Sequence, residues 1–182
     1  MKIQFLDLEL LCWENGDCPQ DQSKDIIQIG IVEVNSEDLK ISRNKSYFIR
    51  PKNKNFDVSN YCTELTGITR SKLIDEGRYF PEAIQSIKKE FGSGKFTYSW
   101  GSDFDPIAKH CIDYDCSNPW AEMGICDFGI IWRTAYNQKH KMSLEEALKS
   151  VGLNFVGIPH DAERDAYNFA LLHNEMLKKI RA

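Results

Sequence analysis

Two acidic residues interrupt an apolar stretch near the start of the chain, Phe5–Leu10 (FLDLEL). The stretch is typical of a β-strand, and because strand side chains alternate between faces, Asp7 and Glu9 must share one face. Burying an unpaired carboxylate is costly unless a positive charge lies beside it. A divalent cation would supply that charge, whereas an edge strand would leave both acids in water. The apolar residues on both sides of the pair favour the metal site.

The composition is that of an ordinary globular protein, with 42% apolar and 27% charged residues over 182 positions. This length is enough for one domain with a full core, so we expect residues 1–182 to form a single domain. No apolar run approaches the length of a membrane span, and the first residues lack the apolar stretch of a signal peptide. We therefore expect a soluble, cytoplasmic protein with no membrane partner.

Charge and cysteine content narrow the function further. The net charge of −4 speaks against a broad basic surface for duplex DNA, but it allows a small site that binds one nucleic-acid end through a metal. The six cysteines have irregular spacings and no C-x-x-C pair, which predicts reduced thiols. One basic cluster could either guide a nucleic-acid strand or protect an exposed strand edge: Arg43, Lys45, Arg50, Lys52 and Lys54.

The first half of the chain predicts three antiparallel strands, over residues 5–10, 25–34 and 39–50, joined by turn-rich segments. Residues 57–91 change to helical spacing, with a proline suited to a first helical turn. A short strand at residues 96–100 follows, and strands and helices alternate from there on. The chain therefore predicts a mixed α/β sheet flanked by helices.

Two further acids lie where the fourth strand runs into a helix. The strand ending at Trp100 is followed by Asp103 and Asp105, and helical apolar spacing begins at Phe104. Pro106 favours the first helical position, which would make Asp105 the N-cap and leave Asp103 free for the site. Capping and turn formation alone would also explain both acids.

The last part of the chain predicts two helices with a histidine between them. Ser143 and Glu146 form a capping box, and Gly152 ends that helix. His160 lies in the next loop, and Asp165 borders the buried face of the final helix, where His160 could reach it. The apolar stripe predicted for that helix is Ala162, Ala166, Phe169, Leu172, Met176 and Ile180.

Together these motifs resemble the DEDDh 3′–5′ exonucleases of the RNase H-like (DnaQ-like) fold. The resemblance extends to the Eri1-type exoribonuclease branch and to related bacterial and phage exonucleases. It is carried by FLDLE at 5–9, WGSD at 100–103 and HDAERDA at 160–166, with CTELTGIT at 62–69 and the helix at 143–153. A single D-x-E is a weak signal, but five stretches in this order are specific.

The resemblance implies a single exonuclease domain over residues 1–182, with a mixed five-stranded sheet and three antiparallel N-terminal strands. It implies that Asp7, Glu9, Asp103 and Asp165 hold two divalent ions, Mg²⁺ or Mn²⁺, with His160 as general base. The usual second-motif aspartate lies four residues beyond the tryptophan. Here Asp103 lies three beyond and Asp105 five, so Asp105 is the alternative.

The implied substrate is the 3′ end of single-stranded RNA or DNA, with RNA slightly favoured and 5′-mononucleotides as products. Relatives often pair, so a homodimer is one expected assembly. Two other classes remain open: a nucleic-acid-binding protein with weak catalysis, and an oligoribonuclease-like enzyme for very short fragments, which the acidic net charge fits. The side chains expected to wedge against the terminal base are Leu8, Leu10, Leu11, Leu65 and Thr66.

Overall fold

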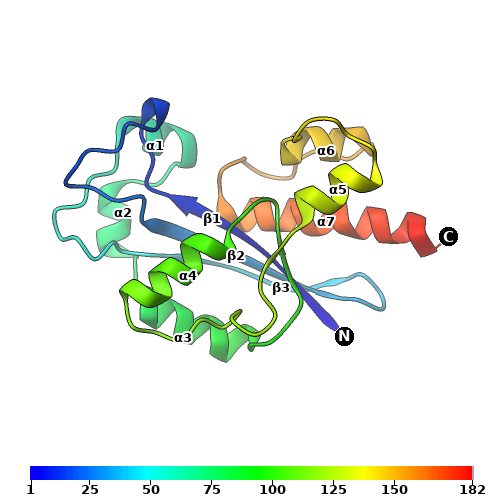
Figure 1. Cartoon of the computed structure of the whole chain (residues 1–182), viewed down its shortest axis with the longest axis horizontal. Helices are drawn as coiled ribbons and strands as arrows, with labels where there is room; N and C mark the ends of the chain where they lie inside the picture. Colours follow the sequence, from blue (N-terminus) through cyan, green and yellow to red (C-terminus); the bar gives the residue numbers. More distant parts are fainter. Residues whose placement is uncertain (182) are drawn as a thin grey trace.

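The computed structural model describes residues 1–181, and its centre is a five-stranded sheet of order β3-β2-β1-β4-β5 (Figure 1). β1, β2 and β3 are antiparallel neighbours, while β4 runs parallel to β1 and β5 runs parallel to β4. This confirms the mixed sheet with three antiparallel N-terminal strands. The strands are β1 (Lys2–Leu10), β2 (Ile26–Asn35), β3 (Ile41–Phe48), β4 (Thr97–Ser99) and β5 (Cys126–Asp127).

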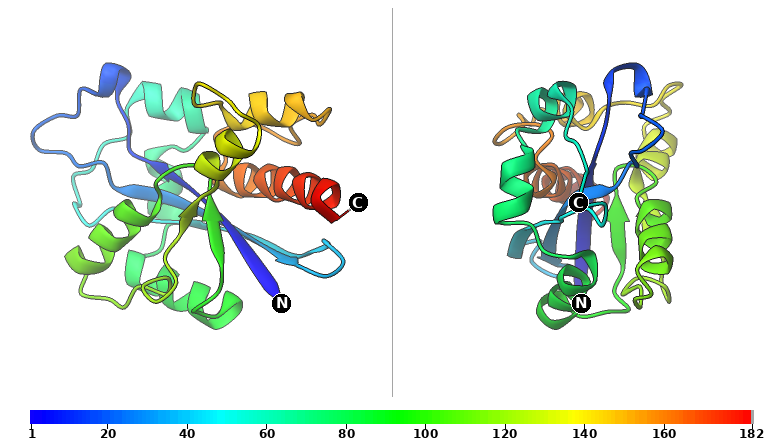
Figure 2. Two further views of the ribbon diagram at one scale, coloured as in Figure 1. Left: turned by 45° about the vertical axis from the view of Figure 1, so that its right-hand side comes forward. Right: turned by 90° about the vertical axis from the view of Figure 1, so that its left-hand side faces the viewer.

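Helices cover both faces of the sheet (Figure 2). The predicted Ser143–Glu146 capping box is present in full. No helix within residues 1–181 is long and apolar enough to cross a membrane. The helices are the 3₁₀ turn η1 (Glu14–Gly16), α1 (Asn60–Thr66), α2 (Arg70–Asp75), α3 (Phe80–Phe91), α4 (Phe104–Asp113), α5 (Phe128–Ala135), α6 (Leu144–Ser150) and α7 (Ala162–Arg181).

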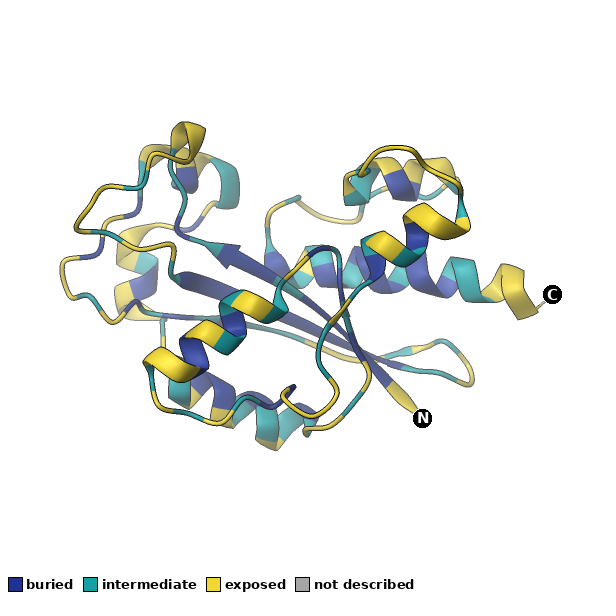
Figure 3. Cartoon of the chain, viewed as in Figure 1, coloured by how far each residue is buried: buried dark blue, intermediate teal, exposed yellow. Residues whose placement is uncertain are grey.

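β1 separates two apolar cores because its side chains alternate between the faces. Leu6 and Leu8 pack with residues of α3 and α4 on one face. Phe5 packs with residues of α5, α6 and α7 on the other, with its ring 5.0 Å from that of Phe169. Asp7 and Glu9 continue the Phe5 face, where the apolar core ends. The strand itself is buried along most of its length (Figure 3).

The sequence predicted reduced cysteines and an apolar stripe along the last helix. All six cysteines are free thiols, as expected. The apolar stripe of α7 is correct as far as Met176, which packs half-buried against the core, but Ile180 is 66% exposed. The helical period therefore continues beyond the part of α7 that packs on the sheet.

Candidate active site

The two acids of β1 face two unusual partners on β2. In the antiparallel register, Asp7 lies opposite Gly30 and Glu9 lies opposite Gln28. Cross-strand partners project from the same face of the sheet. Next to the two acids, this face therefore carries Gly30, which has no side chain, and the amide side chain of Gln28. Both features determine how the last helix arrives there.

Gly30 allows α7 to contact the sheet directly. A β-carbon built on Gly30 would lie 2.0 Å from the carbonyl carbon and oxygen of Ala162, and 2.3 Å from the backbone nitrogen of Glu163. No other residue type fits at this distance, so the glycine brings the first turn of α7 against β2 beside Asp7. The close approach places Asp165, one turn along, at the site.

Gln28 and Asp161 satisfy the free backbone groups at the start of α7. The buried Gln28 amide oxygen accepts a hydrogen bond from the Ala162 N–H at 3.1 Å, and its NH₂ group donates to Ser46 at 2.9 Å. The Asp161 carboxylate accepts from the Glu163 N–H at 3.0 Å, as an N-cap side chain does. The helix start is therefore held by both the strand and its own cap.

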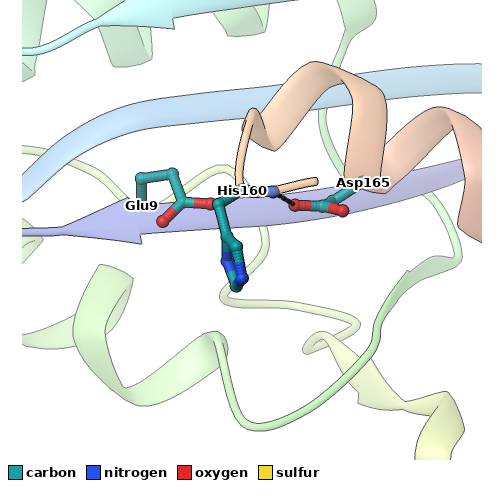
Figure 4. Close-up of side chains that lie close together, drawn as sticks. All are labelled: Glu9, His160 and Asp165. Atoms are coloured by element: carbon teal, nitrogen blue, oxygen red, sulfur yellow. Dashed lines mark hydrogen bonds between the residues drawn. The ribbon is translucent and has the colours of Figure 1, made fainter. Parts of the chain in front are cut away.

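Asp165 and His160 are linked through the backbone. The His160 N–H donates to Asp165 Oδ2 at 2.9 Å, and His160 has a left-handed backbone with φ of 63°. That conformation is uncommon outside glycine, and the His160 ring is exposed. One ligand atom each of Glu9, His160 and Asp165 lies within 4.8 Å of the others (Figure 4).

Asp103 enters the site from the end of β4, immediately before α4. Its side chain makes no capping hydrogen bond and is half-buried. The expectation that Asp105 is the N-cap is wrong, because α4 begins at Phe104 and places Pro106 third in the helix. Proline is tolerated there because the first-turn N–H groups lack intrahelical partners. Asp105 is exposed and accepts a hydrogen bond from Ser102 at 3.3 Å.

The acids strongly perturb one another. Burial, together with the charges of Asp103 and Asp165, raises the pKa of Asp7 well above its usual range. Burial raises the pKa of Glu9 to about 8, with Asp165 and Asp161 adding to the effect. Each of these carboxylates thus lacks a compensating positive charge.

The other two acids behave in the same way. Burial and the charge of Asp127 raise the pKa of Asp103 to about 7, while Lys141 opposes the rise. Burial raises the pKa of Asp165 to about 7 despite the His160 N–H, which stabilises the charged form. Such perturbed groups gather at functional sites more often than elsewhere.

Three of the four acids, Asp7, Glu9 and Asp165, open into a cavity of about 460 Å³, and Asp103 is not among its lining residues. The sequence did not predict Lys141 at the site, because a lysine next to a helix cap is typically solvent-exposed. It reaches the site because Trp100 donates from its indole nitrogen to the Met142 carbonyl at 3.1 Å, which ties this segment to the end of β4. The lining residues are Asp7, Leu8, Glu9, Trp100, Lys141, Met142, Ser143, Leu144, His160 and Asp165.

The expected base-contacting residues are only partly at this cavity. Leu8 lines it, and Leu10 is half-buried against the core. Leu11 is 1% exposed and packs with α1 and α2, so its assignment as a wedge is wrong. Leu65 and Thr66 are half-buried in α1 and do not line the cavity.

The sequence also matches a known family. A profile of the exonuclease family RNase T covers residues 5–172, which is nearly the whole chain. The chain belongs to this exonuclease family. Family membership confirms the resemblance to DEDDh exonucleases, and divalent metals are a general property that the family implies.

Individual relatives extend the comparison. Human 3′–5′ exoribonuclease 1 is 25% identical over 189 residues, covering 97% of this chain and 52% of that protein. The nuclease domain of 3′hExo, a DEDDh family member solved bound to rAMP, superimposes with a TM-score of 0.85 at 23% identity, over 98% and 92% of the two chains.

A further match is a 3′-exonuclease solved in a study of 3′-end-specific recognition of the histone mRNA stem-loop. Its TM-score is 0.85 at 22% identity, over 98% of this chain and 64% of that one. These likenesses confirm the DnaQ-like fold. The chain spans about half the length of the human relative.

Proposed function

We propose that this chain is a divalent-metal-dependent 3′–5′ exonuclease that removes 5′-mononucleotides from single-stranded nucleic acid, with RNA slightly favoured over DNA. The proposal rests on one observation above all. Asp7, Glu9 and Asp165 line one open cavity beside His160, and Asp103 at the β4–α4 junction is near enough to Asp7 for its charge to add to the rise that burial causes in the pKa of that acid. The relatives described as exoribonucleases and as mRNA-binding support RNA as the substrate.

The donor set fits hard divalent cations. All four acids offer oxygen ligands, and their raised pKa values mark a cluster that needs positive charge. Lys141 is the one cation among the residues that line the cavity. Mg²⁺ or Mn²⁺ would supply the missing charge, activate water and stabilise the leaving oxygen when bound.

Each side chain has a distinct proposed role. Asp7, whose pKa is raised by burial and by the other three acids, would be a ligand of the divalent ions, with Glu9 and Asp165 as further ligands. Asp103, directly before α4, would help to hold the ions directly or through water. The apolar Leu8 borders the acids and would contact the terminal base.

His160 would take the proton from the attacking water. Its ring is exposed at the cavity beside Glu9 and Asp165, and its backbone is fixed by the hydrogen bond to Asp165. A histidine ionises near neutral pH, which suits a general base. All of the proposed residues come from one chain, and the homodimer expected from relatives stays a prediction.

The proposal is tested by hydrolysis of a 5′-labelled single strand of about 12 nucleotides, as RNA and as DNA. With Mg²⁺ or Mn²⁺, we expect a ladder shortened from the 3′ end and mononucleotide products. His160→Gln should lower the rate by about 10²–10⁴, and Asp7→Asn should abolish it, with unchanged circular dichroism.

Substitutions of Asp103 and Asp105 test which of the two is the metal ligand of the second motif. Asp103→Asn should abolish hydrolysis, whereas Asp105→Asn, two positions away and exposed, should leave it unchanged. Full metal-dependent activity in Asp7→Asn or His160→Gln would contradict the proposal. Binding without cleavage would favour the nucleic-acid-binding class, and cleavage of dinucleotides alone would favour the short-fragment class.

A further inference from the structure

A second cavity, of about 220 Å³, lies between the end of β3 and α2. Four cationic side chains line it, three from the segment after β3 and one from the first turn of α2, and no acidic residue is among the lining. This is unusual in a chain with a net charge of −4. We call this cavity the basic groove, and its cations are Arg50, Lys52, Lys54 and Arg70.

These cations have no carboxylate partner. Among residues 1–181, no ion pair within 4.0 Å includes any of the four. Arg70 instead donates to the backbone carbonyls of Phe56 at 2.9 Å and Lys54 at 3.3 Å. Its charge therefore stays uncompensated while its position is fixed.

Arg50 supplies a separate indication of a missing ligand. Its Nε–H is buried and has no hydrogen-bond partner in the described structure, and its guanidinium stacks 4.6 Å from the ring centre of Tyr79. A buried donor without a partner costs about 1–3 kcal/mol. An anionic oxygen in the groove would satisfy it, and arginine suits phosphate oxygens in particular.

Two neighbouring cations show what a purely structural role looks like. Lys45 bonds both oxygens of the Glu90 carboxylate at 2.7 Å, and Arg43 donates to the Glu90 carbonyl. These residues hold β3 to α3. The basic cluster seen in the sequence therefore divides into two residues on β3 that bond Glu90 of α3 and three residues at the groove that have no ion-pair partner within 4.0 Å.

The basic groove lies on a path from the active site. Glu9 is opposite Gln28, and Gln28 is opposite Phe48, so these three residues form one row across the sheet. Arg50 follows Phe48 by two positions, which places its Cα about 12 Å from that of Glu9 by strand spacing and rise. Lys72 lies over the Phe48 ring at 4.1 Å and adds a positive charge along the way.

We infer that the basic groove binds the phosphodiester backbone of the substrate strand a few nucleotides upstream of the 3′ end. This inference deepens the proposed function and rests on it for the direction of the strand. Stacked strands advance about 3.4 Å per nucleotide, so the groove would be reached within about four nucleotides. A dinucleotide would not reach it.

Binding of a fluorescein-labelled oligo(U) strand of about 12 nucleotides, measured by anisotropy in EDTA over a salt series, tests the inference. We expect Arg50→Gln/Lys54→Gln/Arg70→Gln to weaken binding about tenfold at low salt and to lower the salt slope by about 0.7 per lost phosphate contact. Lys52→Gln/Lys54→Gln, two exposed side chains, should show a smaller loss of the same kind. The control Arg43→Gln/Lys45→Gln should match the wild type.

A kinetic arm separates the two proposals. In Mg²⁺, the ratio of kcat/KM for the long strand to that for a dinucleotide should fall about tenfold in the groove variants and stay constant in the control. If both groove variants keep the wild-type affinity and salt slope, the inference is overturned even though the enzyme cleaves. If the wild type cleaves no strand, the proposed function is wrong. The anisotropy measurements in EDTA would still test whether the basic groove binds the strand.

Discussion

The contact between Gly30 and α7 makes Gly30→Ala the most informative single substitution. The added β-carbon would lie 2.0 Å from the Ala162 carbonyl, so the start of the helix must retreat by about 1.4 Å to restore an ordinary van der Waals contact. Asp165 and His160 would move with it. Because a misplacement of about 1 Å can lower a rate by about 10², we expect a loss of kcat of that order.

Stability falls as well, which requires a matched control. Overpacking costs about 1–3 kcal/mol, and each kcal/mol lowers the Tm of a chain this size by about 2–4 °C. Gly77 provides the comparison, since its β-carbon would lie 2.2 Å from the Leu73 carbonyl oxygen, between α2 and α3. Gly77→Ala should therefore lose similar stability but keep its kcat.

Both variants are assayed on a dinucleotide, well below their Tm, with the folded fraction measured by circular dichroism. We expect Gly30→Ala to be folded but about 10²-fold slower, and Gly77→Ala to be folded and fully active. Wild-type kcat in Gly30→Ala would refute the view that this glycine positions the site. An equal loss in Gly77→Ala would attribute the effect to stability alone.

Three further predictions concern charge. Without metal, Asp7→Asn should raise the Tm at pH 8 by about 2–4 °C per kcal/mol of repulsion relieved, and Mn²⁺ should stabilise it less than the wild type in calorimetry. Because the folded pKa values of Glu9, Asp103 and Asp165 are raised, the folded state holds protons that the unfolded state has lost, so metal-free stability should fall as pH rises from about 4 to 8. A flat urea-midpoint profile across that window would contradict the charge cluster. Burial would raise the pKa of Glu33, but hydrogen bonds from Lys2 and Lys95 outweigh it and lower the pKa. The charged Glu33 therefore stabilises the fold above its unfolded pKa, and this contribution is lost as pH falls. Glu33→Gln should thus cost about 1–3 kcal/mol at pH 7 and much less near pH 3 in denaturant titrations.

The parts of the fold that the sequence predicts well depend on local sequence patterns. The alternation in β1 placed Asp7 and Glu9 on one face, and the Ser143–Glu146 capping box located α6. The error at Asp105 was also local, because proline is compatible with more than one position in a first helical turn. The structure, with Phe104 as the first helical residue, decides between them.

Long-range contacts could not be read from the sequence. Nothing in the neighbourhood of Gly30 or Gln28 indicates that α7, more than 130 positions away, begins on those two residues. Lys141 was missed for the same reason, since only the Trp100–Met142 hydrogen bond brings its segment to the acids. Leu11 was misplaced because the chain leaves β1 into a third apolar cluster.

The dependence of the site on α7 has a consequence for biosynthesis. β1 leaves the ribosome more than 130 residues before Asp165 and the start of α7 that Gly30 receives. Until then the emerging chain carries Asp7, Glu9 and Asp103 without Asp165. A product that stops before α7 would therefore be unable to assemble the complete cluster of acids.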